Sequence, residues 1–93
     1  MAITPAPGNE SEVVTAGTPV NAALANPNGG FLTNPADAPG PLFVDPVGPA
    51  GVVAAGTTFA VWPGASWSLI PGQTTPTSVN SNYNAHVFSI VVY

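Results

Sequence analysis

The chain has 93 residues, the length of one small domain, and carries four acidic residues and one histidine but no lysine, arginine or cysteine. Without cations it cannot neutralise phosphates, which excludes electrostatic binding to DNA, RNA and anionic membranes. The lack of cysteine excludes disulfide bonds and thiolate metal sites.

The composition predicts a folded chain that is covered by other protein. Apolar residues make up 45% of the chain and charged residues only 4%. Disordered chains combine low hydrophobicity with high net charge, whereas free monomers carry charge on about 25–35% of their surface. A domain of this size also gains little net stability from its own core. We therefore expect it to associate with other subunits.

Long helices, a signal sequence and a membrane span are not expected. The twelve prolines and ten glycines leave room for one helical turn at most, within residues 20–26. Residues 1–12 lack the basic and apolar segments of a secretory signal. The longest apolar stretch, residues 51–62, is interrupted by Gly56 and is too short to span a bilayer.

In chain order, the first half predicts short strands separated by turns. Pro19 cannot donate to a β-ladder and therefore confines its strand to a sheet edge. Asn-Gly in the turn tolerates positive φ. The expected elements are an extended arm (1–12), an edge strand (17–22), a turn (26–30), a strand (31–33), a loop (34–40) and a core strand (42–44).

The second half predicts the clearest strands. Residues 57–62 and 65–70 flank Pro63-Gly64 and suggest a hairpin, and Ala65, Trp67 and Leu69 alternate with serines. Residues 47–56 and 80–84 are expected to be loops. Residues 85–93 are apolar on both faces, which predicts a central strand or one covered by a partner. The whole pattern predicts about six to eight strands in an all-β fold, a small antiparallel β-sandwich or jelly-roll-like barrel over residues 13–93.

No motif in the sequence indicates catalysis. Ser66 lies in Gly-Ala-Ser-Trp-Ser, but a nucleophile elbow needs glycine where Ser68 stands. A triad would require Ser66, His86 and an acid such as Asp45 to meet by chance. The simpler expectation is that His86 is a strand residue with hydrogen bonds at a sheet rim. We therefore predict that the chain is not an enzyme.

No cofactor or metal ion is predicted either. Zinc sites normally use three or more His, Cys or carboxylate ligands, and calcium loops need acidic residues at alternating positions. Neither pattern occurs. Asp37 and the Asp45-Pro46 pair are typical of turns. Trp62 and Trp67 are expected to fill a core or an interface, with stacking on a sugar ring as the alternative.

The order of these segments resembles the small β-modules of tailed-bacteriophage virion proteins, in which short strands lead to a Pro-Gly hairpin and a last hydrophobic strand. The resemblance covers about residues 13–93. The segments that carry it are Gly17-Thr18-Pro19-Val20, Gly30-Phe31-Leu32, Leu42-Phe43-Val44-Asp45, residues 58–69, Val79-Asn80 and residues 86–91.

This resemblance implies a capsid decoration (cement) protein or a related head-fibre or tail subunit. The expected partners are the major capsid protein and further copies of the chain, with a trimer favoured, and the expected location is the capsid exterior. We expect the arm and apolar strand residues to form the contacts: Ile3, Pro5, Pro7, Trp62, Trp67, Phe88, Ile90, Val92 and Tyr93. The alternative is a glycan- or receptor-binding module of a fibre or tail, which would use Trp62, Trp67 or Tyr83.

Overall fold

A computed structural model of the chain describes residues 10–23 and 28–93, and every regular element in these ranges is a β-strand. The prediction of an all-β fold is confirmed. The strands are β1 (Glu12–Val13), β2 (Val20–Ala23), β3 (Gly30–Thr33), β4 (Leu42–Asp45), β5 (Phe59–Val61), β6 (Ser66–Leu69), β7 (Thr77–Asn80), β8 (His86–Val87) and β9 (Ser89–Val92).

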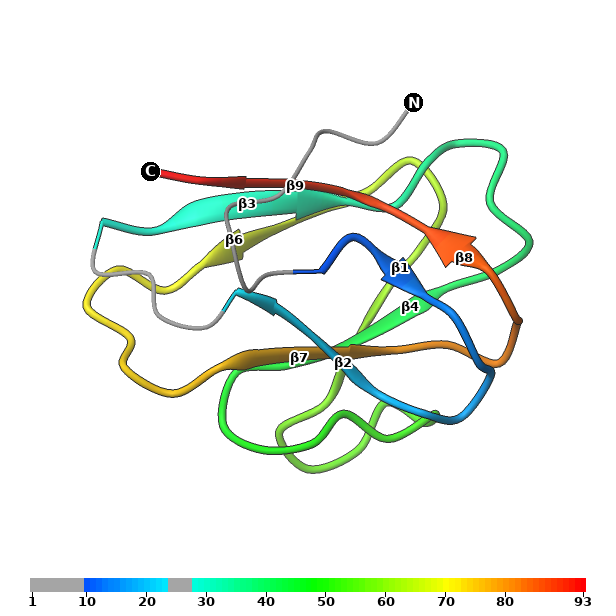
Figure 1. Cartoon of the computed structure of the whole chain (residues 1–93), viewed down its shortest axis with the longest axis horizontal. Coiled ribbons are helices and arrows are strands. Elements are labelled where there is room, and N and C mark those ends of the chain that lie inside the picture. Colours follow the sequence, from blue (N-terminus) through cyan, green and yellow to red (C-terminus); the bar gives the residue numbers. More distant parts are fainter. Residues whose placement is uncertain (1–9, 24–27) are drawn as a thin grey trace.

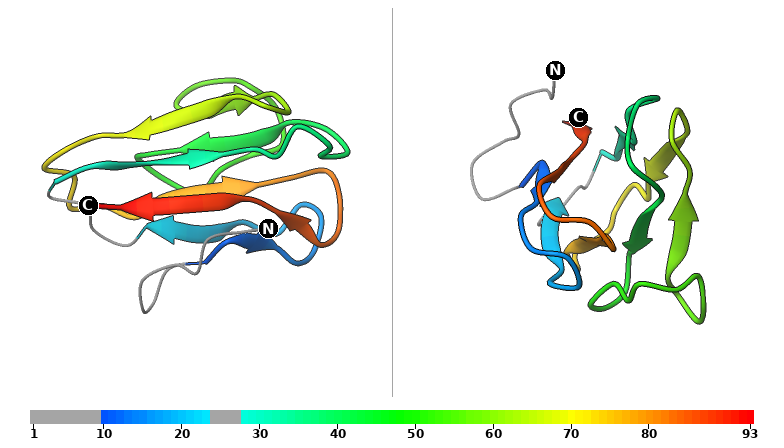
Figure 2. Two further views of the ribbon diagram at one scale, coloured as in Figure 1. Left: turned by 90° about the horizontal axis from the view of Figure 1, so that it is seen from above. Right: turned by 90° about the vertical axis from the view of Figure 1, so that its right-hand side faces the viewer.

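Two antiparallel sheets form the layers of a sandwich (Figure 1). One has the strand order β2-β7-β4-β5 and the other β6-β3-β9, while β1 and β8 form a short ribbon beside them. The right-hand view of Figure 2 looks at the sandwich from one end, with the β6-β3-β9 layer above the β2-β7-β4-β5 layer. The fold is therefore a small antiparallel β-sandwich.

The core lies between the sheets and follows from alternation along each strand. Leu32 pairs with Trp67 and Ile90, and Val44 pairs with Val79 in the other sheet. The pattern expected for residues 65–69 is confirmed, because Leu69 is buried while Ser66 and Ser68 are exposed. The buried apolar cluster comprises Val13, Ala22, Ala23, Leu32, Leu42, Val44, Val61, Leu69, Val79, Phe88 and Ile90.

The loop of residues 46–58 covers the outer face of the β2-β7-β4-β5 sheet. The Ala50 N–H donates to Ser78 Oγ (3.0 Å), and Asn80 Nδ2 donates to the Ala50 carbonyl (2.9 Å). Strand β7 is consequently buried along its whole length. This strand was not predicted, because its polar residues Thr77, Ser78 and Asn80 do not alternate with apolar ones.

The turn at Pro63-Gly64 is present, but the predicted hairpin is wrong. The Ala65 N–H donates to the Trp62 carbonyl (2.9 Å), and Gly64 has φ +85°, as a type II turn requires. Type II turns do not match the twist of paired strands. Strand β5 accordingly pairs with β4, and β6 pairs with β3 in the other sheet.

The last segment is split between two sheets and is not a central strand. His86 and Val87 pair with β1, whereas β9 pairs with β3 at an edge of its sheet. Ile90 therefore points into the core, and Tyr93 is 67% exposed. Apolar residues on both faces do not distinguish a central strand from an edge strand whose outer face is apolar.

The ordered fold begins before residue 13. Strand β1 includes Glu12, and the Glu10 N–H donates to the Asn21 carbonyl (2.9 Å). Residues 10–12, which we assigned to the arm, are therefore bonded to the domain. The rest of the predicted arm lies outside the described residues.

Candidate functional site

Four loops meet at one end of the sandwich, which we call the loop end: residues 14–19, 34–41, 62–65 and 81–85. These loops lie at the right of Figure 1 and face the viewer in the right-hand view of Figure 2. Backbone hydrogen bonds join them in pairs. The Gly64 N–H donates to the Asn34 carbonyl (2.8 Å), the Gly17 N–H to Ser81 (2.9 Å) and the Ala85 N–H to Val14 (3.0 Å).

A buried hydrogen-bond network of three side chains lies beneath these loops. His86 Nδ1 is 2.6 Å from Ser81 Oγ, and His86 Nε2 is 2.9 Å from Asn34 Oδ1. Asn34 Nδ2 donates to the carbonyls of Gly40 and Val61, both at 2.9 Å. Asn34, Ser81 and His86 are at most 1% exposed. The network therefore links β8 with two of the loops and with the end of β5.

The partners assign the tautomer of His86. Asn34 Nδ2 faces two carbonyls, so its Oδ1 must accept a proton from His86 Nε2–H. His86 Nδ1 then accepts from the Ser81 hydroxyl, whose oxygen also accepts from the Tyr83 N–H (3.0 Å). All these groups are satisfied when His86 is neutral. Burial lowers the pKa of His86 below its ordinary value of 6.5, because desolvation disfavours the charged ring.

The structure does not bring Ser66, His86 and Asp45 together. Ser66 is exposed on β6 and bonds to Thr33 Oγ1 (2.8 Å), whereas His86 bonds to Asn34 and Ser81. The expectation that His86 is a hydrogen-bonded strand residue is confirmed. Sequence analysis did not single out Asn34 or Ser81, because each follows a strand in a sequence typical of turns. Ser81 is itself fully buried and offers no accessible hydroxyl.

Asp45 fixes the opposite end of β4, as the turn prediction indicated. Its carboxylate accepts hydrogen bonds from the N–H groups of Val47 (2.9 Å) and Gly48 (3.0 Å) and from the hydroxyls of Thr57 and Thr58. Desolvation alone would raise the pKa of Asp45, but these hydrogen bonds outweigh it and lower the pKa below 3.8. Asp45 therefore joins the two ends of the loop of residues 46–58, and we call this set of hydrogen bonds the clasp.

Neither a metal centre nor a membrane helix emerges from the part of the chain that the structure describes. Within residues 10–23 and 28–93, no three His, Asp or Glu side chains gather closely enough to hold a metal ion. The same ranges contain no helix of the length and hydropathy needed to cross a bilayer.

Some of the exposed apolar side chains lie at or near the loop end. Trp62 is 64% exposed beside the Pro63-Gly64 turn, and Tyr83 is 43% exposed. The Tyr83 ring contacts the His86 ring edge-on, with the ring centroids 6.4 Å apart. Val14 and Val87 are exposed on the β1-β8 ribbon. The loop end thus presents two aromatic rings above the buried network.

Four of the predicted contact residues are exposed or partly buried. Trp62 and Tyr93 are exposed, and Tyr93 lies edge-on to Phe31 with centroids 6.5 Å apart. Trp67 and Val92 are partly buried against the core, where Trp67 packs on Phe59 at a centroid distance of 4.9 Å.

The remaining predicted contacts need correction or lie outside the described residues. Phe88 and Ile90 are at most 1% exposed, because the facing sheet covers them, so they pack within the chain and present no surface to a partner. Ile3, Pro5 and Pro7 lie outside the described residues.

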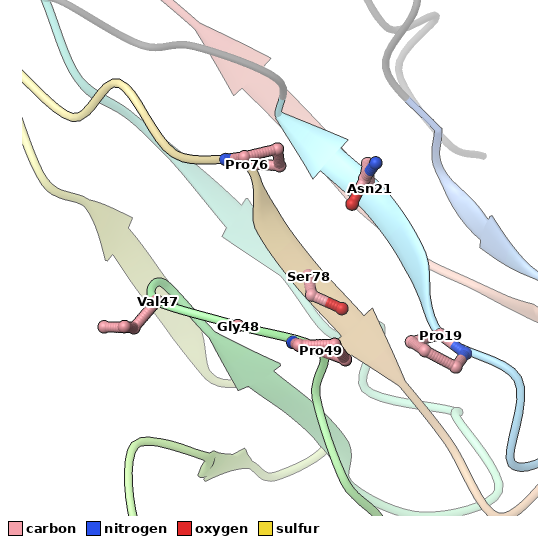
Figure 3. Close-up of a pocket in the computed structure, with 7 residues that line it drawn as sticks. All are labelled: Pro19, Asn21, Val47, Gly48, Pro49, Pro76 and Ser78. Carbon is pink, nitrogen blue, oxygen red and sulfur yellow. The ribbon is translucent and has the colours of Figure 1, made fainter.

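A shallow groove crosses β2 and β7 beside the loop of residues 46–58 (Figure 3). Its volume is about 280 Å³. No charged side chain lines it, and three proline rings contribute to its walls. The lining residues are Pro19, Asn21, Val47, Gly48, Pro49, Pro76 and Ser78.

Comparisons with protein-family models, curated proteins and solved structures found no match to this chain.

Proposed function

We propose that the chain is a non-enzymatic structural protein that binds other protein, in its most specific form a decoration subunit on the exterior of a phage capsid. The observation that carries this proposal is the exposure of nine large apolar side chains among the described residues of a 93-residue chain. They are Val14, Val47, Val53, Phe59, Trp62, Ile70, Tyr83, Val87 and Tyr93.

The buried polar groups support the same proposal. Asp45 closes a loop and His86 joins loops, so both carry structural hydrogen bonds. Burying exposed apolar side chains of this size against a partner would remove apolar surface from water, which favours association. With no lysine or arginine in the chain, contacts to a partner are made by apolar and neutral hydrogen-bonding groups. The more specific capsid assignment rests in addition on the resemblance of residues 13–93 to small virion modules.

Co-sedimentation with phage heads that lack the chain tests the proposal. We expect the purified chain to pellet with the heads at a saturating stoichiometry. Trp62→Ala should weaken this binding at least fivefold, because a large exposed ring is removed without changing the core. Ser68→Ala, an exposed position on β6, is the matched control and should bind as the native chain does. If the native chain stays in the supernatant with every kind of phage head tested, the capsid assignment is contradicted.

The loop end favours a second candidate function, glycan binding by a fibre or tail module. Trp62 and Tyr83 are exposed and belong to two loops at the same end of the sandwich, and aromatic faces of this kind can stack on sugar rings. A glycan array probed with the purified chain separates the two functions. A decoration subunit gives no specific signal, whereas a glycan-binding module gives a signal that Trp62→Ala abolishes.

A further inference from the structure

We propose that neutral His86 is a latch that holds the loop end in one arrangement, and that mild acid releases it. The consequence for partner binding rests on the proposed function, but the latch itself is a property of the isolated chain. The proposal starts from the position of His86. Its ring lies between Asn34, which follows β3, and Ser81, which follows β7.

Each hydrogen-bond partner of His86 is itself bonded to a further loop. Asn34 bonds through its side chain to Gly40 and Val61 and through its backbone to Gly64 and Ala65. Ser81 bonds to the N–H groups of Gly17 and Tyr83 through its carbonyl and hydroxyl oxygens. One imidazole ring thus connects the four loops of the loop end.

Protonation would disturb this network at a defined atom. In the neutral ring, Nδ1 accepts a proton from the Ser81 hydroxyl; in the imidazolium, Nδ1 carries a proton and becomes a donor. The Ser81 oxygen can accept from both His86 Nδ1–H and the Tyr83 N–H, but the Ser81 hydroxyl hydrogen loses its acceptor and must turn away from the ring inside a fully buried site. The Tyr83 ring also contacts His86 and leaves no room for a side chain at Gly40. The hydrogen bond from the Tyr83 N–H to Ser81 Oγ is therefore directly coupled to the protonation of His86.

Within residues 10–23 and 28–93, the hydrogen-bond partners of the His86 ring are Asn34 and Ser81, and no carboxylate bonds to it. From β1, Val13 pairs with His86, while Glu12 pairs with Val87 and so faces the opposite side of the ribbon. From the 34–41 loop, Asp37 is exposed whereas His86 is buried. From the 81–85 loop, the titratable group that faces His86 is the Tyr83 phenol ring. The charge would sit among neutral groups.

The direction of the pH effect follows from linkage. An opened His86 binds protons with its ordinary pKa of about 6.5, whereas burial lowers the pKa of the closed form. Above pH 6.5 both forms are neutral and the latch has its full strength. As the pH falls below 6.5, the opened form gains protons first, so its population rises by up to about tenfold per pH unit until the pKa of the closed form is reached.

Amide hydrogen exchange on the native chain tests the latch. Protection factors at pH 7.0, 6.0 and 5.0, corrected for the intrinsic exchange rates, should fall at the amides of Gly17, Gly64 and Tyr83, by up to about tenfold per pH unit. The amides of Val47 and Gly48 are the internal control. They donate to Asp45, whose lowered pKa keeps it charged at pH 5, so they should hold their protection.

Three outcomes decide the proposal. A selective fall at the loop end, together with a His86 ring titration midpoint below 6.5, supports it. Unchanged protection overturns it, because the loops are then not released. An equal fall at the loop end and in β7 also overturns it, because it indicates global unfolding. His86→Gln, which is neutral at every pH, should remove the pH dependence; if this variant does not fold, the native titration still decides. Binding of the chain to phage heads at pH 7 tests the proposed function separately. The latch and the proposed function can therefore each fail without the other.

Discussion

At the residue scale, two buried titratable groups have opposite charge requirements. Asp45 must be ionised to accept its four partners, whereas His86 must be neutral to satisfy Ser81 and Asn34. They lie at opposite ends of the sandwich and hold different loops. Because the chain contains no lysine or arginine, each is satisfied by neutral hydrogen-bonding groups.

Asp45→Asn should lower the free energy of unfolding by about 2 kcal/mol. The amide keeps one acceptor oxygen but presents an NH₂ group to donors, so charge-assisted hydrogen bonds to backbone and threonine hydroxyls are lost. Urea denaturation measures the change. Asp37→Asn, at an exposed turn position, should change stability by less than about 0.5 kcal/mol. Equal effects of the two substitutions would contradict the clasp.

The stability of the native chain should fall in two separate pH ranges. The contribution of His86 is complete above pH 6.5 and declines below it, because the unfolded chain takes up a proton first. The contribution of Asp45 is complete above its ordinary pKa of 3.8 and is lost as the pH falls through the lower pKa of the folded state. Urea midpoints from pH 8 to pH 3 measure both, and a flat profile between pH 7 and pH 5 would contradict the role of His86.

At the element scale, strands with alternating or wholly apolar residues were predictable, and polar ones were not. β3, β4 and β6 lie where the sequence indicated, because their burial follows their hydrophobicity. β7 was missed because its buried polar side chains, Ser78 and Asn80, are satisfied by hydrogen bonds to Ala50 in the loop of residues 46–58. Partner strands depend on long-range contacts, so the pairing of β5 with β4 could not be read from the intervening turn.

The candidate site also has features that the sequence predicts and features that it does not. The turn role of Asp45 follows from the proline after it, whereas Trp62, which was expected in a core or an interface, is 64% exposed in the isolated chain. The network of Asn34, Ser81 and His86 joins residues 52 positions apart, and no local pattern encodes it. Phe88 and Ile90 were expected at an interface because an apolar strand has the same sequence whether a second sheet or a second chain covers it.

Gly30→Ala should prevent the normal pairing of β3 and β9. Gly30 has φ +154°, and an added Cβ would collide with the Val91 carbonyl oxygen, which is backbone and cannot rotate away. We expect a loss of more than about 3 kcal/mol or failure to fold. Gly48→Ala is the matched control, since nothing lies within 4 Å of its added Cβ. Thermal unfolding compares the two, and a native-like melting temperature for Gly30→Ala would contradict the register of β9.

At the scale of the whole molecule, exposed apolar side chains occur on several sides. Trp62 and Tyr83 lie at the loop end, and Tyr93 contacts Phe31 of β3. Val47 and Val53 lie on the loop of residues 46–58. Such a distribution fits a subunit with more than one neighbour. We expect the isolated chain to self-associate, which sedimentation equilibrium would detect as a mass that rises with concentration. A monomer at every concentration would contradict association between copies.

The most direct test of the account is calorimetric melting of phage heads with and without the bound chain. A subunit that binds only the assembled shell stabilises it by mass action, so the saturated heads should melt at a higher temperature. Trp62→Ala should require a higher concentration for the same increase. Heads that melt at the same temperature with and without a saturating amount of the native chain would contradict the central claim that this protein stabilises a shell by attachment.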